Sequence, residues 1–162
     1  AKESSQTNTT FQRANANKMW ARLHPRSRAN AVWLMNVDVE PQLDEFNEIV
    51  KNAAGSDNVG GRSSAIYNAE KGTLKGRPIV FTEFNATLGT VGDVILADMG
   101  GYLLGTRGGV DSAMSLHLRF DYAETAFRFM FAVDGQSWLA SALTPYKGSN
   151  TLSTFVALAG RP

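Results

Sequence analysis

The sequence predicts an α+β fold, in which helices and strands interleave early and strands dominate late. Three observations support this prediction. Residues 11–23 repeat apolar side chains with the spacing of a helix. Short apolar runs bounded by turn residues follow, for example at 31–36 and 93–98. Residues 113–122 and 126–133 then alternate between apolar and polar side chains, which is the period of a strand.

The first helix is expected to begin near residue 11 and to end at His24. Its apolar side chains fall at i, i+3, i+4 and i+7 and therefore share one face, which consists of Ala16, Met19, Trp20 and Leu23. We expect Thr9 or Thr10 to cap its start. The proline after His24 ends it, because the residue before a proline avoids the α conformation.

A second helix is expected to begin at Pro41, a residue that suits the first helical position. Its apolar stripe consists of Leu43, Phe46, Ile49, Val50 and Ala53. The acidic residues near its start are Asp38, Glu40, Asp44 and Glu45. Carboxylates there offset the positive end of the helix dipole, and we prefer this explanation to a cation site, since their spacing matches no calcium loop. A glycine-rich loop is expected at 55–61.

The other strands follow from short apolar runs between turn residues. They are expected at 31–36, 79–84, 93–98, 102–106 and 154–159. The alternating stretches 113–122 and 126–133 are joined by a polar connection at 121–125. This pattern predicts a long hairpin with one buried face and one wet face.

Composition narrows the classes of function. The chain has 162 residues, of which 43% are apolar and 19% charged, enough for a single domain with a sizeable core. It has no cysteine, which excludes disulfides and thiolate sites. The formal net charge of +1 gives no strong attraction to nucleic acid or anionic lipid. No apolar run approaches the roughly 20 residues needed to span a bilayer, so we expect no membrane partner.

A search for reactive groups gives weak candidates. The glycines of 89–94 lack the lysine and hydroxyl of a phosphate-binding loop. The basic run HPRSR at 24–28 is weak evidence for nucleic-acid binding on a nearly neutral chain. A small hydrolase using His117 with Asp121 or Glu124 stays open as a distant alternative. We assign no catalytic, cofactor-binding or metal-binding residue.

Four segments carry a resemblance to a known family. They are KMWARLHPRSRANAVWLMNVDVEPQL (18–43), GRPIVFTEFNATLGTVGDVILADMGGYLLGTRGG (76–109), HLRFDYAETAFRFMFAVDGQSW (117–138) and ALTPYKGSNTLSTFVALA (142–159). In this order they resemble the major capsid proteins of tailed bacteriophages, the Hong Kong 97-type family. Lys75 stands where the family pattern has an apolar residue. The N-terminal arm, extended loop and spine helix that usually come first have no counterpart in this sequence, so we assign no crosslink residue.

The resemblance implies a truncated Hong Kong 97-type fold. We expect a central mixed sheet with flanking helices and a long-stranded β arm. Residues 1–10 form a polar lead-in, 11–110 resemble the axial domain, and 111–162 resemble the C-terminal strands of the peripheral domain.

The implied function is that of a structural subunit of an icosahedral phage or prophage shell, without enzymatic activity or cofactors. Expected partners are other copies, as pentamers and hexamers of the full-length protein, and packaged DNA held without sequence-specific contact. The expected location is the virion, and the bacterial host cytoplasm during assembly. The expected subunit interface consists of Thr87, Leu88, Gly89, Thr90, Asp93, Thr106, Arg107, Gly108 and Gly109, at two turns (87–93 and 106–110). A bacterial nanocompartment shell, or encapsulin, of the same fold is the nearer alternative.

Overall fold

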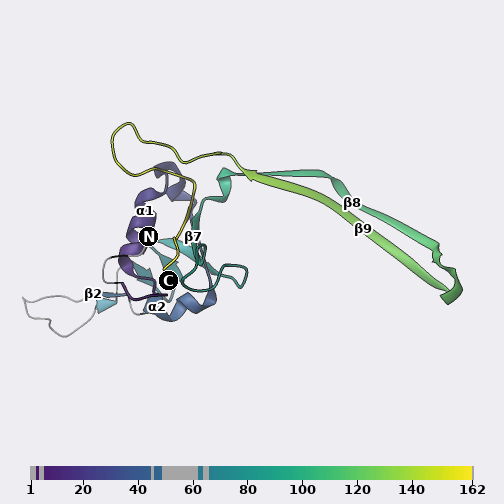
Figure 1. Cartoon of the computed structure of the whole chain (residues 1–162), viewed down its shortest axis with the longest axis horizontal. Coiled ribbons are helices and arrows are strands. Elements are labelled where there is room, and N and C mark those ends of the chain that lie inside the picture. Colours follow the sequence, from purple (N-terminus) through teal and green to yellow (C-terminus); the bar gives the residue numbers. More distant parts are fainter. Residues whose placement is uncertain (1–2, 4–5, 45, 49–61, 64–65, 162) are drawn as a thin grey trace, which may run out of the picture. The chain divides into compact units, whose positions relative to one another are not determined.

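The computed structural model describes residues 3, 6–44, 46–48, 62–63 and 66–161. The chain divides into two compact units (Figure 1). We call Ala1–Gly100 with Leu139–Pro162 the body and Gly101–Trp138 the arm. The domain boundary expected after residue 110 therefore differs from the division that the structure shows.

The body begins with helix α1 (Arg13–Arg22), followed by the 3-10 helix η1 (Pro25–Ala29). This is the predicted first helix, and it ends before His24 as expected. The predicted cap is wrong, because Gln12 occupies the N-cap position. The Gln12 backbone N–H donates to Asn15 Oδ1 at 2.9 Å, and this bond satisfies a donor at the helix start. Thr9 instead has a left-handed backbone, with φ of 56°.

The main sheet of the body has the strand order β10–β7–β1–β6–β5–β4. Its strands are β1 (Val32–Met35), β4 (Tyr67–Asn68), β5 (Thr73–Leu74), β6 (Arg77–Phe81), β7 (Val94–Ala97) and β10 (Phe155–Ala157). Strands β1 and β6 are parallel, and the other neighbours are antiparallel. The mixed central sheet is confirmed, with the strands expected at 31–36, 79–84, 93–98 and 154–159 present at slightly different bounds.

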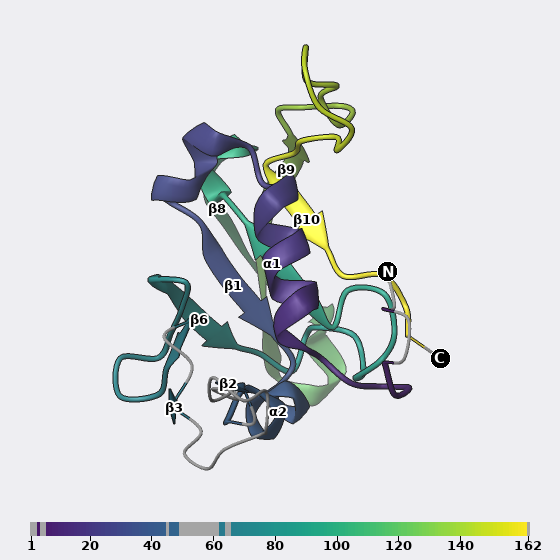
Figure 2. The same ribbon diagram turned by 90° about the vertical axis from the view of Figure 1, so that its left-hand side faces the viewer.

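One face of this sheet forms the core of the body. Trp33 and Met35 of β1 lie opposite Leu96 and Val94 of β7, and all four are fully buried. Helix α1 lies over β1 and β10 and adds Met19 to the same cluster (Figure 2). The indole N–H of Trp33 donates to the backbone oxygen of Leu74 at 3.0 Å, so the largest core side chain has its polar atom satisfied.

The second predicted helix is wrong in its length. The 3-10 helix η2 (Val37–Val39) leads into α2 (Glu40–Asp44), which has five residues. Phe46 then packs against Phe11 with ring centroids 5.4 Å apart. Strand β2 (Asn47–Glu48) follows and pairs with β3 (Arg62–Ser63), so tertiary contacts replace the continued helix. Ile49, Val50, Ala53 and the loop expected at 55–61 lie outside the described residues.

The arm is a long antiparallel hairpin. Strand β8 (Tyr102–Arg119) pairs with β9 (Glu124–Ser137), and the 3-10 helix η4 (Phe120–Tyr122) connects them. Ala123 completes the connection in a left-handed conformation, with φ of 55°. The 3-10 helix η3 (Met99–Gly101) precedes β8. The predicted hairpin is confirmed, and its connection at 120–123 overlaps the expected 121–125 region.

The turn expected at 106–110 is wrong, because β8 continues through it. Thr106 pairs with Val133 and Arg107 with Ala132, and the ladder resumes where Asp111 pairs with Met130. Between Arg107 and Asp111 the register shifts, so this segment is an irregularity within one strand. The strands expected at 102–106 and 113–122 are therefore parts of a single strand.

Candidate functional site

The arm has one apolar face. The register places Phe127 opposite Met114 and Phe129 opposite Ser112. Since successive side chains of a strand point to opposite faces, these residues share a face with Phe131 and Val133. The large side chains of this apolar face are Tyr102, Leu104, Met114, Leu116, Phe127, Phe129, Phe131 and Val133.

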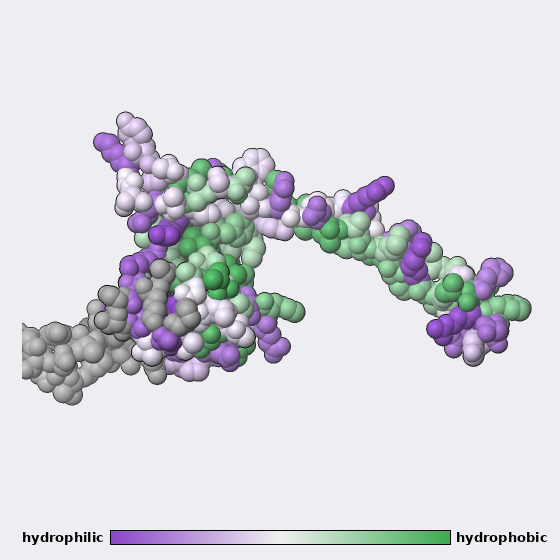
Figure 3. All heavy atoms as spheres, in the orientation of Figure 1, coloured by the Kyte–Doolittle hydropathy of each residue, from purple (hydrophilic) through white to green (hydrophobic). Residues whose placement is uncertain are grey.

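The apolar face of the arm is uncovered. Phe129 is 71% exposed and Met114 65%, and the other large side chains of this face are exposed as well. Apolar residues run along the arm in Figure 3. The expectation of a buried face is therefore wrong for this chain. The alternation that predicted it is present, but the arm itself consists of two strands and a short 3-10 connection and so has no second layer of its own.

The opposite face of the arm is mixed. Arg107 lies opposite Ala132 and Arg128 opposite Ala113, and the same face also has the exposed apolar side chains Leu103 and Met130. Near the turn, Arg119 Nη1 lies 3.1 Å from Glu124 Oε2 in an exposed ion pair.

An isolated two-stranded ribbon is at best marginally stable in water, and exposed apolar patches of this kind mark interaction surfaces. The arm thus has one mixed face and one largely apolar face, and the large side chains of the apolar face are exposed.

The expected interface turn at 87–93 lies in the body and is only partly exposed. Thr87 and Thr90 are exposed, and the Thr90 N–H donates to the Thr87 backbone oxygen at 3.1 Å. Leu88 is half-buried and packs against the core. Gly89 and Asp93 are buried.

Asp93 belongs to the interior of the body, which corrects its expected place at a subunit surface. Its carboxylate forms an ion pair with Arg161, and both side chains are fully buried. The Gly89 N–H donates to Asp93 Oδ2 at 2.9 Å. Arg161 also donates through Nε to the Thr10 backbone oxygen at 2.6 Å, and the Thr9 N–H donates to the Arg161 backbone oxygen at 2.8 Å. This network joins three segments that are remote in sequence.

The second expected interface segment, at 106–109, lies in the arm. Thr106 and Arg107 are exposed residues of β8. Gly108 has φ of 70°, and a Cβ added there or at Gly109 would meet no atom within 4 Å. All four residues of this segment are exposed, in contrast to the buried Gly89 and Asp93.

The described residues show no arrangement for the alternative hydrolase. His117 is exposed, and its backbone N–H donates to Ser115 Oγ at 3.3 Å. Glu124 is paired with Arg119, and no hydrogen bond joins His117 to Asp121 or Glu124 in the described part of the chain. No group of three or more His, Cys, Asp or Glu among the described residues is placed to hold a metal ion. No described helix is long and apolar enough to cross a membrane.

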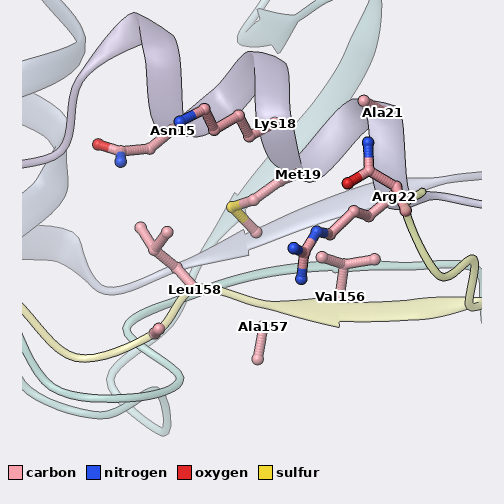
Figure 4. Close-up of a pocket in the computed structure, with 10 residues that line it drawn as sticks. Asn15, Lys18, Met19, Ala21, Arg22, Val156, Ala157 and Leu158 are labelled. Atoms are coloured by element: carbon pink, nitrogen blue, oxygen red, sulfur yellow. The ribbon is translucent and has the colours of Figure 1, made fainter. Parts of the chain in front are cut away.

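A hollow of about 370 Å³ lies between α1 and β10 in the body (Figure 4). Its lining residues are Asn15, Lys18, Met19, Ala21, Arg22, Asn150, Val156, Ala157, Leu158 and Ala159. This lining contains no carboxylate, histidine or hydroxyl group. Its one amine, that of Lys18, is exposed and donates to Glu3 Oε2 at 2.6 Å, so the hollow shows no paired catalytic groups among the residues that line it.

The described residues thus form a mixed-sheet body and an arm with one exposed apolar face. The chain belongs to the phage capsid family, because the model of that family matches residues 1–148. The resemblance predicted from four segments is thereby confirmed. Neither the nanocompartment shell nor the hydrolase is favoured by this result.

A solved structure has the same fold. It is the capsid of an empty GTA particle computed with C5 symmetry, which is 16% identical to this chain, with a TM-score of 0.54. The match covers 83% of this chain and 43% of the other, so the chain spans less than half the length of that relative. A comparison with curated proteins finds no match.

Sequence reasoning found the apolar face of the arm and the family, but it missed Arg161. The alternation of 113–122 and 126–133 was a sufficient signal for the face. The pairing of Arg161 with Asp93 spans 68 residues and has no local signal.

Proposed function

We propose that this chain is part of a subunit that assembles into the pentamers and hexamers of an icosahedral phage shell around packaged DNA. Assembly takes place in the host cytoplasm, and the product is a component of the virion. The single observation that carries the proposal is the uncovered apolar face of the arm, in a chain of the phage capsid family. Such a face is stable in water only when other protein covers it.

The contacts proposed for the shell come from both units. In the arm they are the apolar face and the exposed segment Thr106, Arg107, Gly108 and Gly109. In the body they are the exposed Thr87 and Thr90 with Leu88 beside them. Head-to-tail contacts of this kind close into rings when the rotation between copies fits. Gly89 and Asp93 support the 87–93 turn from inside.

The test uses the longer gene product, with light scattering and negative-stain electron microscopy over a concentration series. We expect rings or shells from the unaltered protein. Phe129→Ser removes a large apolar side chain that is 71% exposed, so we expect it to abolish shells while the body stays folded. Arg128→Ser is the matched control, since Arg128 is the preceding residue of the same strand and lies on the opposite face of the arm.

Two outcomes would contradict the proposal. One is a full-length protein that stays monomeric at every concentration. The other is Phe129→Ser assembling as well as Arg128→Ser, which would show that the apolar face is not a shell contact.

A further inference from the structure

Positive charge is concentrated in one segment of the body although the net charge of the chain is only +1. Residues 4–37 contain no aspartate or glutamate. The cations of this segment are Arg13, Lys18, Arg22, Arg26 and Arg28. They lie on α1 and η1. Arg26 and Arg28 belong to the basic run 24–28, which by sequence alone was weak evidence for nucleic-acid binding.

The structure gathers part of this charge around one aromatic ring. The guanidinium carbon of Arg28 lies 5.6 Å from the centroid of the Trp20 ring, and Lys75 Nζ lies 5.7 Å from it. Arg28 Nη2 also donates to the Trp20 backbone oxygen at 3.3 Å. Both distances suit cation–π attraction, which is strongest for tryptophan. We call Trp20, Arg28 and Lys75 the Trp20 cluster.

A specific backbone turn brings Lys75 into this cluster. Lys75 and Gly76 connect β5 to β6 as a two-residue hairpin loop, with φ of 53° and 71°. Positive φ at both positions is the geometry of a type I′ turn, which favours Asn or Gly over Lys. The Lys75 N–H donates to the Ile66 backbone oxygen at 2.6 Å, which holds the turn in place. Lys75 thus occupies a turn position that favours another residue.

The Trp20 cluster lacks a negative partner within the described residues. The ion pairs found there do not include Arg28 or Lys75. Arg28 Nε is buried without a hydrogen-bond partner in the structure. Burial lowers the pKa of Lys75, and the positive charges of Arg28 and Arg13 lower it further. An anion bound at the Trp20 cluster would offset the repulsion between Lys75 and these arginines.

We infer that the Trp20 cluster is a contact site for the phosphodiester backbone of nucleic acid, bound without regard to sequence. A polyanion suits several like charges spread over α1, η1 and the 75–76 turn better than a single carboxylate does. A guanidinium fork and a lysine point charge are the usual partners of phosphate oxygens. Cations already lie against the Trp20 ring, so phosphate contact rather than base stacking is the expected mode. This inference rests on the proposed function, in which the shell encloses DNA.

The test measures fluorescence anisotropy of a short labelled DNA duplex titrated with this chain at several salt concentrations. Lys75→Asn removes one charge and places a residue that tolerates positive φ, so the turn is retained. We expect a several-fold loss of affinity, and a salt slope that is smaller by about 0.9, the value for one phosphate contact. Arg28→Gln should act in the same direction. Lys147→Asn is the matched control, an exposed lysine of the body outside the cluster, and it should leave affinity and slope almost unchanged.

The pH dependence of DNA affinity is a second test of the Trp20 cluster. Because the pKa of Lys75 is lowered, raising the pH neutralises Lys75 before an ordinary exposed lysine. Affinity should therefore begin to fall below the usual pKa range of lysine, and Lys75→Asn should remove that early fall. Circular dichroism checks that each variant is folded.

Three results would overturn the inference. The first is wild-type affinity and salt slope in both Lys75→Asn and Arg28→Gln. The second is an equal loss in Lys147→Asn, which would show a general charge effect. The third is competition by polyglutamate as effective as that by DNA of equal charge, which would identify a carboxylate surface. Shell formation by the longer gene product is measured separately. If shells form but the variants bind DNA like the wild type, only the inference about the Trp20 cluster is contradicted.

Discussion

In both the body and the arm, alternate side chains of a strand share a face, but the two faces differ in burial. In the body, Trp33 and Leu96 face a layer that includes α1, and both are fully buried. In the arm, Met114 and Phe129 lie on a two-stranded ribbon and stay exposed. Alternation therefore determines which side chains share a face, whereas burial depends on whether another layer covers that face. Under the proposed function, the covering layer of the arm is other protein.

The two units also differ in their ion pairs. The Asp93–Arg161 pair of the body is fully buried, and further hydrogen bonds hold both side chains. The Arg119–Glu124 pair of the arm is exposed at both side chains, by 64% and 56%. Buried pairs are costly to break, because removing one partner leaves an uncompensated charge. Exposed pairs are screened by water and contribute little.

The largest effect is expected from Arg161→Met. The substitution leaves the Asp93 carboxylate buried with the Gly89 N–H as its remaining donor, and it removes the bond to the Thr10 backbone oxygen. The free energy of unfolding of the body should fall by about 3–5 kcal/mol. Denaturant unfolding followed by circular dichroism measures this change.

The double variant Asp93→Asn with Arg161→Met is the control for that experiment. It removes both charges and keeps an acceptor for the Gly89 N–H, so it should be more stable than Arg161→Met alone. If Arg161→Met lowers the free energy of unfolding by less than about 1 kcal/mol, the loss is that expected for an exposed ion pair. This result would contradict the burial of the Asp93–Arg161 pair.

The sequence predicted the parts of this fold that depend on neighbouring residues. The stripe of Met19 and Leu23 predicted α1, and the alternation at Phe127 and Phe129 predicted the hairpin. Phe46 shows where such reasoning fails. It fits a helical stripe after Leu43, but its contact with Phe11, remote in sequence, accompanies the early end of α2.

The candidate sites were predicted less completely than the fold. The glycine-rich turn containing Gly89 was expected to face a neighbouring subunit, yet Asp93 within it is turned inward by Arg161. Lys75 was noticed only as a departure from the family pattern, and its proximity to Trp20 required the paired strands β5 and β6. In each case the decisive partner is distant in the sequence, and no local spacing encodes the contact.

Substitutions at two glycines with positive φ should have effects of intermediate size on the free energy of unfolding, and they compare the body with the arm. A Cβ at Gly89, where φ is 91°, would lie 2.8 Å from Thr9 Cγ2 and 3.1 Å from Thr9 Cα, whereas Gly108 has open space around it. Gly89→Ala adds a clash to the left-handed strain and should destabilise the body by about 2–3 kcal/mol. Gly108→Ala carries the strain alone and should cost about 1 kcal/mol.

Hydrogen exchange measured segment by segment distinguishes these two variants. Gly89→Ala should speed exchange around the 87–93 turn and β7, and Gly108→Ala should speed exchange only near the irregularity of β8. Equal effects at the two sites would show that the space around Gly89 can adjust, and would remove this distinction between the body and the arm.

The smallest effect is expected from Arg119→Gln in the arm. The Arg119–Glu124 pair lies beside the turn, with an Nη1–Oε2 distance of 3.1 Å, but water reaches both side chains. The loss in unfolding free energy should stay below about 0.5 kcal/mol and vanish at high salt. Denaturation of this chain at low and high salt measures it, next to Arg161→Met. A loss above about 1 kcal/mol would mean that the pair is covered in solution, as happens when copies associate through the arm. Repeating the measurement at higher dilution separates these causes, because a contribution from association falls with concentration and one from within the chain does not.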